Sequence, residues 1–361
     1  MTATAPDRLA VASRALGSHC VAVRVLEDGR PWFAAADGGV FIGIDERTAP
    51  VVAHDGLLAA VPAPEGPTLY SSGEDGRVCR LDCQSGAPAT VTELGRVPRR
   101  WVGVLTANRA GAVAWASGNT AWVRDAGGGL REIRHARAIE ALALSPTGLL
   151  LGIAAYDGLT LHALDDATVA PRVLPWPGVH AGITFSPDGR FVVSRLKDAT
   201  LHAWRLADGS GMRMGVYPAN VGDWAFSAGG RWLVTSGAGA AVAWPFEGEG
   251  GPMHQTALEL GEPRESPVTA VACHPVEDIV AMGHADGCVR LAHLATGQQR
   301  VLRDATTDNI ATGAVTALAW QHHGLSLAWG THGGEGAVAF FPSTDSGDSR
   351  NFADATQEST A

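Results

Sequence analysis

Several features that define common protein classes are missing from this sequence of 361 residues. Only one of its 27 basic residues, Lys197, is a lysine, and the net charge of −10 opposes a general attraction to nucleic acid or to anionic membranes. No apolar run approaches the roughly 20 residues that a membrane-spanning helix needs. Residues 1–14 lack the apolar segment of a secretion signal. We therefore expect a cytoplasmic protein that has neither nucleic acid nor membrane as a partner.

Cysteine is also scarce. The five cysteines are odd in number and scattered along the chain, so we expect no disulfide framework, in keeping with a cytoplasmic location. The motifs G-x-S-x-G and H-E-x-x-H are absent, as are a P-loop and a G-x-G-x-x-G that opens a helix. We therefore expect no catalytic residues, no cofactor and no enzymatic activity.

Glycine, by contrast, is abundant, with 45 residues, which suits a chain with many tight turns. Residues 180–204 show what such turns connect: three short runs of alternating apolar character, separated by turns of Pro, Asp and Gly. This pattern predicts three antiparallel strands. The turn between the second and third runs recurs along the chain at intervals of 38 to 48 residues. Its eight copies are Asp37-Gly38, Asp75-Gly76, Gly118-Asn119, Asp157-Gly158, Asp198-Ala199, Ala238-Gly239, Asp286-Gly287 and Gly333-Gly334.

These intervals approximate the period of about 40–45 residues of a four-stranded propeller blade, and a weaker fourth strand usually follows the third. We predict an all-β fold: a closed β-propeller of four-stranded antiparallel blades that occupies residues 1–342 as one domain. Eight blades are predicted, with seven as the alternative because residues 101–135 form an irregular unit. The last unit lacks a fourth strand, which we expect Leu9–Ser13 to supply. Residues 343–361 contain almost no apolar side chains and are expected to be a disordered polar tail.

The repeat resembles the WD-repeat β-propeller family over residues 8–342. The likeness is strongest in residues 69–83, 142–163, 183–205 and 271–294. The Trp-Asp pair of that family is nowhere intact, and its nearest form is Trp204-Arg205. The resemblance implies an interaction scaffold, a repeat protein that binds other proteins. It also places four aspartates at the structural position of the hairpin: Asp75, Asp157, Asp198 and Asp286.

The resemblance further implies that the loops between blades share one face with these hairpins, and that partners bind there. Arginine and aromatic residues, which are enriched at binding hot spots, occur in one part of this loop set: Arg96, Arg99, Arg100, Arg134, His135, Arg137, Trp176 and Tyr217. Acidic residues occur in another part: Glu259, Glu262, Glu265, Asp304 and Asp308. We therefore expect the basic and aromatic arc to dock a protein or an acidic peptide. Alternatively, these arginines pair with nearby carboxylates such as Glu93 and Glu132 and bind nothing.

Two further alternatives stay open at this point. Cys273, His274, His284 and Cys288 belong to one predicted blade, so an alternative function is the handling of a small molecule or a metal there, including as an enzyme. A metal site needs three or four converging ligands, and we expect none here. Trp176 lies between two prolines, so its side chain either covers the core or forms an exposed anchor. The sequence leaves the oligomeric state open.

Overall fold

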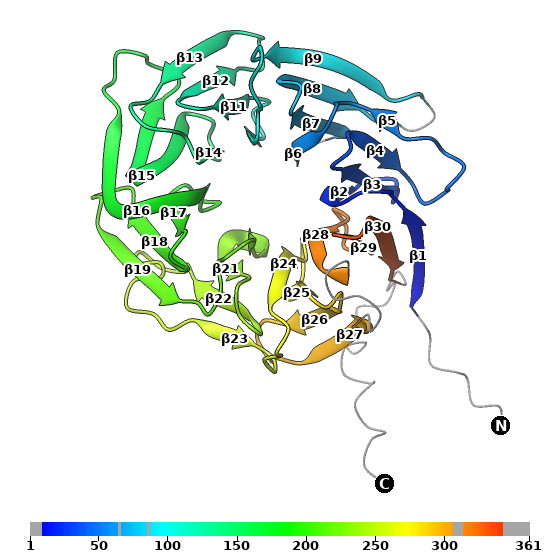
Figure 1. Cartoon of the computed structure of the whole chain (residues 1–361). Coiled ribbons are helices and arrows are strands. Elements are labelled where there is room, and N and C mark those ends of the chain that lie inside the picture. The colour runs from blue at the N-terminus through cyan, green and yellow to red at the C-terminus, as the bar shows by residue number, and fades with distance from the viewer. Residues whose placement is uncertain (1–8, 64–65, 85–86, 306–312, 342–361) are drawn as a thin grey trace, which may run out of the picture.

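The computed structural model of the chain describes residues 9–63, 66–84, 87–305 and 313–341. These residues form seven sheets that follow one another around a ring (Figure 1). The helical content of the described residues is one 3-10 turn, Ala228–Gly230. No helix in these ranges is both long and apolar enough to cross a membrane. The predicted polar tail, residues 343–361, lies outside the described residues.

Six of the sheets have four antiparallel strands, as the repeat predicts. The first sheet consists of β2 (Cys20–Val25), β3 (Pro31–Ala35), β4 (Gly39–Ile42) and β5 (Val51–Val52). The second consists of β6 (Leu57–Pro62), β7 (Thr68–Gly73), β8 (Arg77–Asp82) and β9 (Thr90–Arg96). The third consists of β10 (Val104–Ala107), β11 (Val113–Ser117), β12 (Thr120–Arg124) and β13 (Leu130–Arg134).

The fourth sheet has six strands: β14 (Ala141–Leu144), β15 (Leu150–Ala163), β16 (Arg172–Phe185), β17 (Phe191–Leu196), β18 (Thr200–Arg205) and β19 (Gly211–Val216). The fifth consists of β20 (Trp224–Phe226), β21 (Trp232–Thr235), β22 (Ala241–Pro245) and β23 (Leu258–Leu260). The sixth consists of β24 (Val268–Cys273), β25 (Ile279–His284), β26 (Val289–His293) and β27 (Gln299–Arg303). The seventh consists of β28 (Val315–Trp320), β29 (Ser326–Thr331), β30 (Glu335–Phe340) and β1 (Ala10–Ala15).

The prediction of eight separate blades is therefore wrong, because the structure has seven sheets. The fourth and fifth sequence repeats share one sheet, since β15 and β16 each continue for 14 residues through positions where separate strands were expected. Residues 172–179 of β16 pair with β15, and residues 180–185 pair with β17. The irregular third repeat, which was the reason for considering seven, forms a complete sheet of its own.

Tight turns occur at or beside all eight predicted positions. In most of them a glycine has positive φ, such as Gly76 (φ 73°) and Gly287 (φ 85°). The fourth turn falls inside β15, where Asp157 has a φ of 67°. In the sixth repeat the positive φ lies at Gly237, one residue before the predicted pair. The recurring turn therefore located each repeat even where it did not delimit a separate sheet.

The N-terminal strand completes the last sheet, as predicted. Residues 10–15 of β1 pair antiparallel with residues 335–340 of β30. The seventh sheet also contacts the first, because the Thr316 hydroxyl donates to the carbonyl of Cys20 (2.6 Å) and the Gln321 amide donates to that of Glu27 (2.9 Å). Segments from both ends of the described chain therefore meet in one sheet (Figure 1).

The apolar core lies between neighbouring repeats. One cluster packs Trp32 of the first sheet against Leu69 and Leu81 of the second. Another packs the two repeats of the six-stranded sheet against each other through Leu161, Phe185 and Trp204. A sheet of this kind cannot bury its faces alone, so each repeat is stabilised by its neighbours. All five cysteines are free, as expected from their spacing.

Candidate protein-docking face

Two kinds of loop contact each other on one face of the ring: the loops between repeats, and the hairpins between second and third strands. The amide of Val97 donates to the carbonyl of Gly76 (2.8 Å), and that of Ile139 donates to Gly118 (2.8 Å). The amide of Lys197, in a hairpin, donates to the carbonyl of Val179 (3.0 Å). These backbone hydrogen bonds fix the loops relative to the strands, so side chains on them have a rigid support.

The loop between the second and third sheets presents two arginines and a tryptophan to solvent. Arg99 has a φ of 58°, which is uncommon for a residue with a side chain, and the amide of Arg100 donates to Val97 across this turn (3.4 Å). Both arginines are exposed, and within the described ranges neither forms an ion pair. The next side chain, Trp101, is 64% exposed. Its carbonyl accepts a hydrogen bond from the hydroxyl of Ser117 (2.7 Å).

A second basic and aromatic pair lies on the neighbouring repeat. The guanidinium of Arg137 lies over the ring of Tyr156, 5.1 Å from the ring centroid, and also approaches Asp157 at 3.5 Å. Tyr156 is 51% exposed. Arg100 extends toward Gly118. The carbonyl of Gly118 accepts a hydrogen bond from the amide of Ile139, in the loop that also carries Arg137. We call Arg99, Arg100, Trp101, Arg137 and Tyr156 the basic-aromatic cluster.

Sequence analysis identified the three arginines of this cluster but missed both aromatic residues. Trp101 stands beside a predicted strand run, where packing between blades would account for a tryptophan. The signal that it lies in a loop was the segment Pro98-Arg99-Arg100 directly before it, since proline and consecutive charges disfavour a strand. Tyr156 immediately precedes the Asp157-Gly158 turn, and its exposure could not be inferred from the alternating pattern.

Three of the predicted binding residues are engaged by neighbouring groups. Arg96 forms an ion pair with Glu93 (2.8 Å), and its hydrogen bond lowers the pKa of that carboxyl. Arg134 pairs with Glu132 at 3.0 Å. His135 is half-buried, with Nε2 3.2 Å from the hydroxyl of Thr160. The proposed pairing with Glu93 and Glu132 therefore describes these two arginines but not Arg99 and Arg100.

Two predicted aromatic residues lie on or in the core. Trp176 is half-buried and stacks on the ring of His202, with ring centroids 3.8 Å apart. Tyr217 is buried, and its hydroxyl contacts Thr235 (2.8 Å) and the indole N–H of Trp244 (2.6 Å). Trp176 therefore packs as a cover over the core, and Tyr217 is inaccessible to a partner in this structure.

The acidic residues on the other arc share their surroundings with arginines. Glu259, Glu262, Glu265 and Asp304 are exposed, while Asp308 lies outside the described residues. Arg264 of the same region pairs with the hairpin aspartate Asp286 at 2.7 Å. This arc is therefore mixed in charge. Within the described residues, Arg99 and Arg100 of the basic-aromatic cluster carry positive charge without an ion pair, whereas Arg137 approaches Asp157.

Comparison with known proteins finds two related sequences. Residues of this chain are 25% identical to telomerase protein component 1 of Rattus norvegicus over 191 residues, and 26% identical to the protein of the same name from Mus musculus over 192 residues. Each match covers 52% of this chain but only 7% of the relative. Together with the ring of mostly four-stranded sheets, these matches make the chain similar to WD-repeat propellers. No family model matches the sequence.

A buried hydrogen-bond network joins a histidine, a serine and a hairpin aspartate in the second repeat. His54, which is buried, donates from Nδ1 to Asp75 (3.1 Å), and its Nε2 accepts from the hydroxyl of Ser71 (2.8 Å). Sequence analysis found Asp75 but not His54, because no glycine precedes this histidine. Elsewhere the network is incomplete: His180 contacts Ser194 (2.8 Å) and the carbonyl of Trp176, but no aspartate.

The remaining hairpin aspartates of the WD-repeat pattern make local contacts. Asp157 accepts weakly from the amide of Gly178 (3.4 Å), and Asp198 accepts from the hydroxyl of Thr200 (2.6 Å). Asp286 accepts from the amide of Cys288 (3.0 Å). These aspartates hold the turns, and among the hydrogen bonds of the described residues Asp75 is the hairpin aspartate that also binds a buried histidine.

The cysteines and histidines of the sixth sheet do not converge on a common point. His274 packs edge-on against Trp320, whereas His284 contacts the carbonyl of Ser266 (3.0 Å). The thiol of Cys273 points to the carbonyl of Ala225, and burial raises its pKa to about 12. Among the described residues no three potential ligands are grouped for a metal.

Proposed function

We propose that this chain is a WD-repeat propeller that acts as a protein-interaction scaffold, and that it docks an acidic protein segment on the basic-aromatic cluster. WD-repeat propellers are typically scaffolds for protein interactions. The observation that supports this site most directly is the loop at residues 99–101, where two arginines without a described ion pair lie beside a largely exposed tryptophan.

The chemistry of the cluster favours a carboxylate-bearing partner. Each arginine offers a planar set of donors that matches a carboxylate in a bidentate arrangement. Trp101 and Tyr156 offer apolar surface of the kind that forms binding hot spots. A partner with acidic residues next to an apolar side chain would use both. The overall charge of −10 repels acidic segments elsewhere, so it directs them to this site.

The test is a comparison of two triple charge reversals. In the first, Arg99, Arg100 and Arg137 are changed to glutamate, and in the control the exposed residues Arg47, Arg109 and Arg213 are changed in the same way. Each protein is used to capture partners from nuclease-treated extract. Each captured protein is then divided into segments, and these are measured against the purified chain. We expect an acidic segment to bind the wild type and the control but to lose at least tenfold in affinity for the first variant.

Two results would overturn the proposal. Equal capture by both triple variants would exclude the cluster as the docking site. Capture that occurs only from extract without nuclease treatment would instead indicate a nucleic-acid partner, whose binding should weaken steeply with salt. A further variant, Trp101→Ala, separates charge from apolar contact, since it keeps all three arginines.

A further inference from the structure

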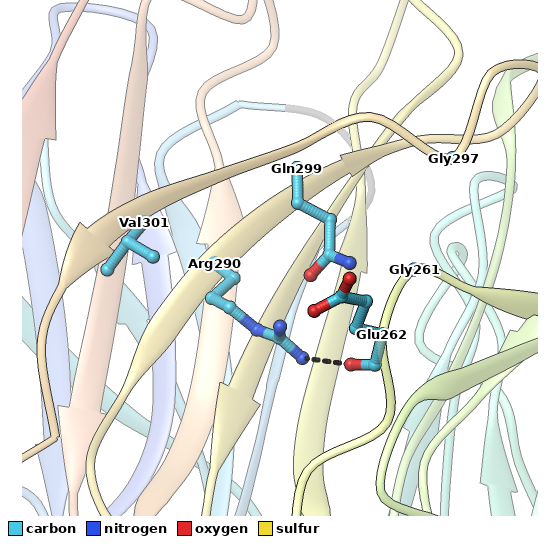
Figure 2. Close-up of a pocket in the computed structure, with 6 residues that line it drawn as sticks. All are labelled: Gly261, Glu262, Arg290, Gly297, Gln299 and Val301. Carbon is cyan, nitrogen blue, oxygen red and sulfur yellow. Dashed lines mark hydrogen bonds between the residues drawn. The ribbon is translucent and has the colours of Figure 1, made fainter. Parts of the chain in front are cut away.

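A small pocket opens between the fifth and sixth sheets, away from the basic-aromatic cluster. It has a volume of about 390 Å³ and is lined by Gly261, Glu262, Arg290, Gly297, Gln299 and Val301. This volume is in the range of small-molecule sites in proteins, roughly 300–1,000 Å³. Figure 2 shows the polar ends of Arg290, Glu262 and Gln299 gathered in this space, with Val301 at one side.

Arg290 is a buried cation without a carboxylate partner. Its side chain is only 6% exposed, and no ion pair to it is found in the described part of the chain. Its Nε donates to Nε2 of His284 (3.2 Å), and one terminal nitrogen donates to the carbonyl of Glu262 (3.3 Å). Both acceptors are uncharged, and the carboxylates of Asp286 and Glu262 act on the guanidinium electrostatically without forming an ion pair with it among the described residues. Burying a charge in this way is costly unless an anion completes the site.

The orientation of Arg290 is fixed by a chain of hydrogen bonds. His284 is fully buried, and its Nδ1 donates to the carbonyl of Ser266 (3.0 Å). That bond leaves Nε2 of His284 as an acceptor, so the imidazole is neutral and can receive the N–H of Arg290. The cation therefore lines the pocket with a defined geometry.

The pocket also offers acceptors, from β27, which pairs with the strand of Arg290, and from the loop after β23. The side-chain oxygen of Gln299 is buried and has no hydrogen-bond partner within the described residues. Glu262 adds an exposed carboxylate next to it (Figure 2). Gly261 allows this arrangement, because a β-carbon there would lie within 3.0 Å of the Gln299 side chain. These acceptors call for a ligand that carries N–H donors.

We propose that this pocket binds a small aliphatic amino acid, whose carboxylate pairs with Arg290 and whose ammonium group donates to Glu262 and Gln299. A zwitterion satisfies the buried cation and the unpartnered acceptor at once, and Val301 offers apolar contact for an aliphatic side chain. This inference does not depend on the docking of a protein partner.

The experiment titrates the purified chain with L-leucine by calorimetry at pH 7. Two halves of the same molecule serve as matched probes: 4-methylpentanoate has the carboxylate without the ammonium group, and 3-methylbutylamine has the reverse. For a ligand of this size we expect L-leucine to bind with a dissociation constant of about 0.1–5 mM. Each half should bind at least tenfold more weakly.

Variants assign the contacts. Glu262→Gln is at an exposed position, so it should leave the fold intact, weaken L-leucine about tenfold and leave 4-methylpentanoate unchanged. Arg290→Gln should weaken both carboxylates. Absence of saturable L-leucine binding to the wild-type chain, or equal affinity of the wild type and Glu262→Gln, would overturn the proposal. Neither result would bear on the basic-aromatic cluster, because no protein partner is present in the titration.

Discussion

Replacing Asp75 with alanine should destabilise the fold far more than the same change at another hairpin aspartate. The Asp75 side chain is 13% exposed, and its carboxylate accepts hydrogen bonds from Nδ1 of His54 (3.1 Å) and from the amide of Arg77 (2.9 Å). Its removal leaves the N–H of a fully buried imidazole without an acceptor, which costs about 1–3 kcal/mol. The lost bond to the turn amide adds about 1 kcal/mol. We therefore expect Asp75→Ala to lower the free energy of unfolding by about 2–4 kcal/mol.

The assay is urea denaturation followed by tryptophan fluorescence, with Asp198→Ala as the control. Asp198 occupies the matching turn of the fifth repeat, but it is exposed and contacts only the hydroxyl of Thr200 (2.6 Å) among described groups. Its replacement should cost less than about 1 kcal/mol. The reasoning would be refuted if Asp75→Ala unfolded within 0.5 kcal/mol of the wild type, or if the control variant were the less stable of the two.

Three further predictions concern pH, the last sheet and a close contact. Burial lowers the pKa of His54, His180 and His284 below its usual value, and that of His202 to about 4. The unfolded chain therefore binds protons that the folded chain does not, so the free energy of unfolding should fall as the pH drops from 6.5 toward 4. His202 alone should contribute up to about 3 kcal/mol to this fall. Equal urea midpoints at pH 7 and pH 5 would contradict the prediction. Deleting residues 1–15 removes β1 and so leaves the edge of β30 without a partner strand. Light scattering should then show concentration-dependent association that exceeds that of the full chain. Gly330→Ala should lower the free energy of unfolding by about 1–3 kcal/mol, because the new β-carbon would lie within 3.0 Å of Cys20. In the same urea assay the control Gly103→Ala should be nearly neutral, because its β-carbon would meet only Leu58, at 4.0 Å.

The repeat was predictable because each turn needs a backbone conformation that glycine adopts most easily. Gly76 and Gly287 mark such turns directly, with φ of 73° and 85°. The pairing of the N-terminal strand was predictable too, since the last repeat had only three strands to offer. The number of sheets was not predictable. It depends on whether β15 and β16 stay hydrogen-bonded beyond a single repeat, and no local residue pattern indicates that.

The candidate site was only partly predictable, for a similar reason. Charged loop residues such as Arg99 can be read from the sequence, but whether a carboxylate lies within reach of them depends on the register of neighbouring strands. The partners of Arg96 and Arg134 were the exception and could be named from the sequence, because Glu93 and Glu132 lie close to them on the same strands. The pocket at Arg290 gave no signal, because it needs Gln299 and Glu262 from separate sheets to meet.

The pairing of β1 with β30 has a consequence for synthesis of the chain. The ribosome makes residues 10–15 long before their partners, residues 335–340, because the six other sheets lie between them in the sequence. At about 5–20 residues per second, that delay is roughly 15 to 65 s. Throughout it, the earliest strand has no sheet to join while the other repeats stack in turn. Quality control in the cell therefore meets a nascent chain in which residues 10–15 stay available to chaperones until residues 335–340 have been made.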